Sequence, residues 1–104
     1  MSFTGNEGTV ITLAEGSTMT ADYRATISTG DTLALAVGKN KLASILGQSG
    51  CMGIRMYYAL NDKGDQQLVL VGVDANGDDM TAGTIVDNLV PCPTTCSQKN
   101  SLNS

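Results

Sequence analysis

The sequence contains no histidine. Histidine is the commonest general base near neutral pH and the commonest nitrogen ligand of zinc. Its absence excludes the usual Ser–His and Cys–His pairs of nucleophilic catalysis. The chain also lacks the Ser-x-x-Lys and Gly-x-Ser-x-Gly motifs and a Gly-rich phosphate-binding loop. We therefore predict that the protein is not an enzyme, and we expect no cofactor.

Basic residues are few. Six Lys and Arg stand against ten Asp and Glu, the net charge is −4, and Lys39 and Lys41 are the nearest approach to a basic run. Binding of nucleic acid through phosphate neutralisation needs a basic stripe, so we predict no nucleic-acid partner. The charged fraction of 15% is also low for a globular domain. A surface so poor in charge resists self-association weakly, which is compatible with an oligomer.

Long apolar runs are missing as well. The longest, residues 68–73, is far too short to cross a bilayer. Residues 1–8 carry neither the basic nor the apolar region of a secretory leader. We predict no membrane partner, and we expect a cytoplasmic protein or one carried as a component of a larger particle.

The length of 104 residues fits a single domain over residues 1–104, with a polar N-terminal arm (1–8) and an irregular C-terminal tail (91–104). The β-branched run at 9–13 predicts a strand. After a break at 16–18, large apolar residues recur every fourth position and predict a helix that ends at Gly30. These apolar residues are Met19, Tyr23 and Ile27.

The middle of the chain predicts an extended connection followed by a helix. Residues 31–38 favour the extended connection, which ends at Gly38. The segment 39–47 follows, and the spacing of Leu42, Ile45 and Leu46 marks the buried face of a short helix.

The second half of the chain predicts three strands. Residues 52–60 alternate, and residues 67–73 are apolar on both faces, as in a central strand. A hairpin turn at 61–65 joins the two. A second turn at 74–79 leads to a third strand within 83–90. On strand 52–60 the face expected in the core carries Ile54, Met56, Tyr58 and Leu60.

These elements together predict the α+β class: a small three- to four-stranded antiparallel meander packed against two short helices. The fourth strand would come from residues 9–13.

The chain from Gly38 onward resembles a small family of proteins from Bacteroidota genomes that has no established activity. The residues that carry the resemblance are Gly38-Lys39, Ile45-Leu46, the block 50–58, the block 68–77, the Pro-Cys-Pro-Thr-Thr-Cys segment at 91–96 and the final Leu-Asn-Ser. The resemblance implies that the strand–turn–strand block and the cysteine tail form one unit. It implies no cofactor and no catalytic residue.

Cys51, Cys92 and Cys96 allow three interpretations. All three could be inert thiols, since free cysteines are usually small buried apolar residues. Cys92 and Cys96 could form a disulfide, whose small ring would stabilise the fold by about 2 kcal/mol but would need an oxidising compartment. The three thiolates could also bind a metal with a fourth ligand from Asp, water or another chain.

The segment from Asp74 to Asp79 gathers carboxylates around Asn76-Gly77. Such a cluster invites a calcium interpretation. Its glycine is fourth rather than sixth and its twelfth residue is Ile85 instead of Glu, so the EF-hand pattern fails. We predict a tight turn with solvated carboxylates instead.

The strand at 52–60 also supplies candidate interface residues. Tyr57 and Tyr58 point to opposite faces, so we expect one in the core and one on the surface. Arg55 is expected to be a solvent-facing charge, or a partner of Asp74 or Asp87 on a neighbouring strand. An exposed Tyr beside a flat apolar strand suits an interface. The interface residues that we predict are Arg55, Tyr57, Val69 and Val71.

The hypothesis that follows is a structural or protein-interaction module that binds itself, as a homo-oligomer or a subunit of a filament or particle, or binds another protein. The alternative is a small metal- or ligand-binding protein that uses Cys51, Cys92 and Cys96.

Overall fold

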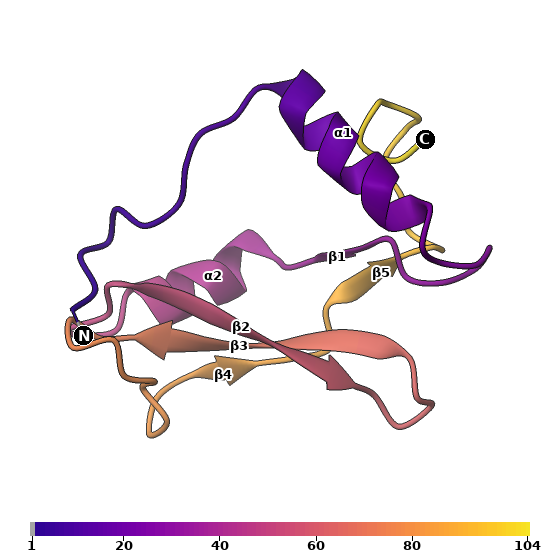
Figure 1. Ribbon diagram of the computed structural model, residues 1–104. Coiled ribbons are helices and arrows are strands. Elements are labelled where there is room, and N and C mark those ends of the chain that lie inside the picture. The colour runs from indigo at the N-terminus through magenta and orange to yellow at the C-terminus, as the bar shows by residue number, and fades with distance from the viewer. Residues whose placement is uncertain (1) are drawn as a thin grey trace.

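Two helices and two antiparallel sheets make up the fold in the computed structural model, which describes residues 2–104 (Figure 1). The sheets have the strand orders β2-β3-β4 and β1-β5. The predicted α+β class is therefore confirmed. The elements in chain order are α1 Leu13–Arg24, β1 Ala34–Ala36, α2 Lys39–Leu46, β2 Gly53–Leu60, β3 Gln66–Val73, β4 Ile85–Val86 and β5 Val90–Cys92.

The β2–β3 hairpin is the longest paired unit, with all eight residues of each strand in register from Gly53↔Val73 to Leu60↔Gln66. The turn forms where the sequence predicts it. The Asn61 side-chain oxygen accepts from the backbone N–H groups of Lys63 and Asp65 at 2.9 Å each, which lets the side chain replace a backbone partner.

The third predicted strand is divided between the two sheets. Only Ile85–Val86 pairs with β3. Asn88 then adopts a left-handed conformation (φ 57°), which redirects the chain into β5. β5 pairs with β1, so the expected extended connection at 31–38 contains a short strand, and the tail becomes irregular only after Cys92.

The core lies between α2 and one face of the three-stranded sheet (Figure 1). Ile45 of α2, Leu70 of β3 and Leu89 are its buried centre. The helix predicted at 39–47 is confirmed as Lys39–Leu46, and its spacing correctly identifies Ile45 as buried. Leu46, which is predicted on the same buried face, is instead 51% exposed. Around this centre lie the half-buried side chains of Leu35, Val37, Leu42, Cys51, Ile54, Leu68 and Val86.

The first helix begins earlier than the sequence analysis predicted, and it ends earlier as well, at Arg24 and not at Gly30. Thr12 and Glu15 form a reciprocal capping box, in which the Thr12 hydroxyl accepts from the Glu15 N–H and the Glu15 carboxylate accepts from the Thr12 N–H. This accepted bond lowers the pKa of Glu15. The cap starts α1 at Leu13, so the expected break at 16–18 is wrong and Gly16 lies inside the helix.

Helix α1 buries none of its residues, although Met19 and Tyr23 share the apolar face from which the helix is predicted. Its side-chain hydrogen bonds to distant parts of the chain go mainly to the C-terminal tail. Arg24 Nη1 donates to the Leu102 carbonyl at 2.5 Å, and Ser17 Oγ lies 2.7 Å from Ser101 Oγ. The helix therefore rests on the C-terminal tail and not on the sheet (Figure 1).

The predicted strand at 9–13 is also corrected. Residues 9–12 form no strand, and Leu13 belongs to α1. They belong to an arm, residues 4–12, that links the sheet end near Gly53 to α1 and stands apart from the sheet (Figure 1).

Phe3 anchors the beginning of this arm. Its N–H donates to the Ala75 carbonyl at 2.9 Å, and its ring covers Gly53 so closely that an added Cβ would lie 2.5 Å from Phe3 Cε1. Gly53 therefore allows the ring to approach the backbone of β2.

Along residues 2–104, no helix has the length and apolar character needed to cross a bilayer.

Because the core is small, we expect Ile45→Ala to lower the free energy of unfolding by about 2–5 kcal/mol through the cavity it leaves. Leu46→Ala, at the neighbouring but half-exposed position, should cost less than about 1 kcal/mol. Urea unfolding followed by circular dichroism measures both. If Ile45→Ala does not fold, Ile45→Val should cost about 0.5–1.5 kcal/mol. Equal costs at positions 45 and 46 would contradict this location of the core.

Candidate functional site

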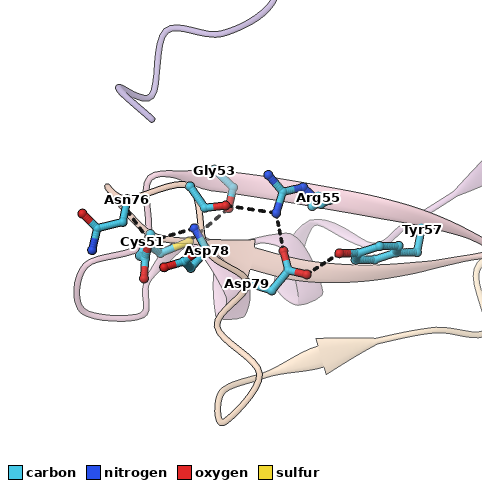
Figure 2. Close-up of polar contacts among 9 residues, drawn as sticks. Cys51, Gly53, Arg55, Tyr57, Asn76, Asp78 and Asp79 are labelled. Carbon is cyan, nitrogen blue, oxygen red and sulfur yellow. Dashed lines mark hydrogen bonds and ion pairs between the residues drawn. The ribbon is translucent and has the colours of Figure 1, made fainter. Parts of the chain in front are cut away.

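Arg55, Tyr57 and Asp79 form a polar cluster on the face of the sheet away from α2 (Figure 2). Arg55 and Tyr57 are two residues apart on β2, so their side chains share one face. Asp79 arrives from the loop after β3, where it forms an isolated bridge with Val73. Arg55 Nη1 lies 2.5 Å from Asp79 Oδ1, and the Tyr57 hydroxyl donates to Asp79 Oδ2.

The electrostatics of this cluster follow from one carboxylate with two donors. The hydrogen bond from Tyr57 and the ion pair with Arg55 lower the pKa of Asp79. The same hydrogen bond raises the pKa of the Tyr57 phenol, and the bond with Asp79 raises the pKa of Arg55. Both carboxylate oxygens are therefore engaged, and a depressed pKa makes Asp79 a weak proton acceptor.

The cluster closes the loop between β3 and β4 onto β2. Arg55 Nη1 also donates to the Gly77 carbonyl at 3.2 Å. Within the loop, Asp74 Oδ1 accepts from the N–H groups of Asn76 and Asp78, which builds the predicted turn. Arg55 has an acidic partner, which is one of the two outcomes that the sequence predicts. That partner is Asp79 and not Asp74 or Asp87.

The three cysteines lie at two places. Cys92 and Cys96 are joined, with an S–S distance of 1.92 Å, in the segment that contains β5. Cys51 is a free thiol between α2 and β2, where Sγ lies 3.2 Å from the Gly53 carbonyl oxygen (Figure 2). Within residues 2–104, no three His, Cys, Asp or Glu side chains lie close enough to hold a metal ion. The structure therefore does not bring Cys51, Cys92 and Cys96 together as metal ligands.

The predicted interface residues share one face of β2 and β3, but their exposure differs. Tyr57 is 48% exposed, and Arg55 and Val69 are half-buried. Val71 is only 4% exposed, so its side chain packs within the chain and offers little surface to a partner.

The opposite face of β2 is more exposed than the sequence analysis predicted. Of its four large residues only Ile54 packs against the core. Tyr58 is 86% exposed and Leu60 is 73% exposed, and Met56 is exposed as well. The expectation that one of Tyr57 and Tyr58 lies in the core is therefore wrong, because α2 is too short to cover the far end of β2.

A hollow of about 340 Å³ adjoins this exposed surface. It lies between α1, β1 and the sheet, and its lining is mainly apolar. The residues that line it include Met19, Tyr23, Leu33, Leu35, Tyr58 and Leu68.

Sequence reasoning missed one structural residue, Gln67, which it placed in an apolar strand. Its buried side chain donates to the Leu89 carbonyl and accepts from the Leu89 N–H, both at 3.0 Å. A polar residue at the start of a two-sided apolar strand was the available signal, because a buried amide needs partners.

Comparisons with models of protein families, with curated proteins and with solved structures found no match. The resemblance to a Bacteroidota family stays a prediction.

The Asp79 cluster predicts an elevated pKa for Tyr57. The hydrogen-bonded Tyr57 phenol adds to the free energy of unfolding at every pH below about 10, its pKa in the unfolded chain. This contribution is lost as the pH rises through the pKa of Tyr57 in the folded state. The Asp79 carboxylate adds to the free energy of unfolding above a pH of about 4, its pKa in the unfolded chain. This contribution is lost as the pH falls through the pKa of Asp79 in the folded state. We expect Asp79→Ala to lower the pKa of Tyr57, measured by NMR titration of the ring. The control Asp78→Ala, at the exposed neighbouring position, should leave it unchanged. Equal effects of the two variants would contradict the cluster.

The cysteine geometry predicts the thiol count. The denatured, unreduced protein should react with one equivalent of a thiol reagent, from Cys51, and the reduced protein with three. Cys51→Ser should abolish the reaction of the unreduced protein. Three reactive thiols before reduction would contradict the Cys92–Cys96 link.

Proposed function

We propose that the protein is a self-assembling structural module, whose partner is a second copy of itself. The observation that carries the proposal is the amount of surface left uncovered in the single chain. The accessible surface is 7424 Å², whereas a compact monomer of 10.8 kDa exposes about 5,500 Å². The radius of gyration, 15.3 Å, is likewise larger than the value of about 13 Å for a compact chain of this length.

The excess has the size of an interface. Each chain exposes roughly 1,900 Å² more than a compact monomer, so two chains together could cover roughly 3,800 Å². Obligate homodimer interfaces fall between about 2,000 and 5,000 Å². Assembly would therefore bring the exposed surface of each subunit close to that of an ordinary globular protein.

The chemistry of the excess surface supports the same role. Much of it is apolar, including the side chains of β2 that α2 does not reach and those of α1. Monomeric proteins rarely expose large contiguous apolar patches. A net charge of −4 on 104 residues offers little electrostatic resistance to association.

The Cys92–Cys96 disulfide bears on the choice between the two locations expected from the sequence, the cytoplasm and a larger particle. Disulfides persist outside the reducing cytosol. Within this proposal, the link therefore favours a component of a larger particle over a free cytoplasmic protein.

The test is the mass of the full chain in solution, measured by native mass spectrometry and light scattering over a wide range of micromolar concentrations. We expect a dimer or a larger assembly, with the monomer appearing only on dilution. The same measurement with reductant separates noncovalent assembly, which should survive, from chains linked through cysteines. A monomer at every concentration, or an assembly that reductant abolishes, would overturn the proposal.

A further inference from the structure

We infer that residues 9–11 of one chain add as a strand to the free edge of β2 in a second copy of this chain. The inference rests on the proposed self-assembly and names the segments that make it.

The acceptor is the outer edge of β2. This strand pairs with β3 on one side and with no other strand among residues 2–104. The Asn61 N–H donates to the Asp65 carbonyl at the end of the hairpin, and bonded pairs alternate in an antiparallel ladder. The backbone groups of even-numbered residues on β2 therefore point outward. Within residues 2–104, they form no hydrogen bond with any other part of the chain. The four residues with these outward-pointing backbone groups are Ile54, Met56, Tyr58 and Leu60.

This edge has few of the features that prevent strand addition. Monomeric proteins protect edge strands with short length, lysine, proline or a covering segment. β2 is eight residues long and contains neither lysine nor proline. Its single charged residue, Arg55, is engaged with Asp79. The edge is therefore open to another strand.

The donor is the part of the arm that the sequence predicts as a strand. Residues 9–12 are all β-branched, which strongly favours extended pairing. Yet the backbone groups of residues 8–11 form no hydrogen bond within the described part of the chain, and Val10 is 99% exposed. A segment with strand propensity and no partner thus exists in the same molecule as an open strand edge.

The direction of the arm favours a second copy over the chain's own β2. The arm is tied at Phe3 to the Gly53 end of the sheet and at its other end to α1, so the arm and β2 both lead away from the same end of the sheet, while the arm rises from it towards α1 (Figure 1). Pairing within one chain would be parallel. A second copy can present its arm in the antiparallel direction, which is the slightly more stable pairing.

The side chains match in either register. Because side chains alternate along a strand, Val10 and Ile11 would point to opposite faces of the enlarged sheet. One of them therefore lies on the α2 side, beside the exposed Met56, Tyr58 and Leu60. Strand addition would cover both the unpaired backbone and apolar side chains that α2 leaves exposed.

The test uses proline at two successive arm positions, Val10→Pro and Ile11→Pro, in the full chain. Successive N–H groups of a strand point to opposite sides, so one of the two variants must remove a donor that faces β2. We expect at least one of them to raise the dissociation constant of the assembly about tenfold or more. Val10→Thr, which keeps the β-branch and the N–H, should change it less than about threefold. Sedimentation analysis gives the constants, and circular dichroism checks that α1 persists in Ile11→Pro.

A second measurement locates the pairing. Hydrogen exchange should slow at residues 9–11 when the chains assemble and should return to the fast rate on dilution. An assembly that both proline variants leave unchanged would overturn the arm as donor while the proposed function stands, as in direct pairing of two β2 edges. Slow exchange at residues 9–11 that does not depend on concentration would mean pairing within one chain and would overturn the inference. A wild-type chain that stays monomeric overturns both proposals.

Discussion

The packing of Ile45 against Leu70 and Leu89 is the contact on which the rest of the structure depends. It joins a helix, the central strand and the segment that leads into the second sheet, which are separate in the sequence. Gln67, three residues before Leu70 on β3, reinforces it, because its amide binds both backbone groups of Leu89. Hydrophobic burial and a satisfied polar clamp thus hold the same segment. With Leu89 fixed, the chain must leave the three-stranded sheet and continue as β5.

A core of this size covers only part of the molecule. Helix α2 has eight residues, about 12 Å of length, whereas the eight residues of β2 extend more than twice as far. The helix can therefore shield only one end of the hairpin. The other end, with Tyr58 and Leu60, lies below α1, which is held by contacts with the C-terminal tail and leaves a hollow above the sheet. The uncovered surface is thus a consequence of element lengths.

The sequence predicted well those elements whose signals are local. Helix α2 has its apolar spacing and flanking glycines, and the β2–β3 hairpin has alternation and an Asn-initiated turn. The start of α1 is hard to predict because its capping residue, Thr12, lies in a β-branched run that itself favours a strand. The division of the last strand depends on Asn88 and on the distant Gln67, so no local pattern announces it.

The polar cluster of Arg55, Tyr57 and Asp79 likewise depends on a contact between distant residues that no local pattern predicts. The alternation of β2 correctly places Arg55 and Tyr57 on one face, but their shared partner lies more than twenty residues away. Three acidic residues of the loop were comparable candidates in sequence. Asp74 is used to build the turn itself, and the bridge between Val73 and Asp79 brings the latter back to the sheet. Loop geometry, which the composition does not encode, therefore selects the partner.

The strand predicted at residues 9–13 does not form, but the strand propensity on which the prediction rests is a real property of the segment. Natural sequences are locally consistent with their folds, so a segment with strong strand propensity and no strand partner is a local conflict. The capping box resolves it for Thr12 and Leu13 but not for residues 9–11, whose backbone groups stay unpaired within the described part of the chain. An unpaired edge on β2 is the complementary conflict. Both the unpaired arm and the unpaired edge of β2 are unfavourable in the single chain. One association between two copies would remove both, because the free backbone N–H and C=O groups of the arm can pair with those of the β2 edge.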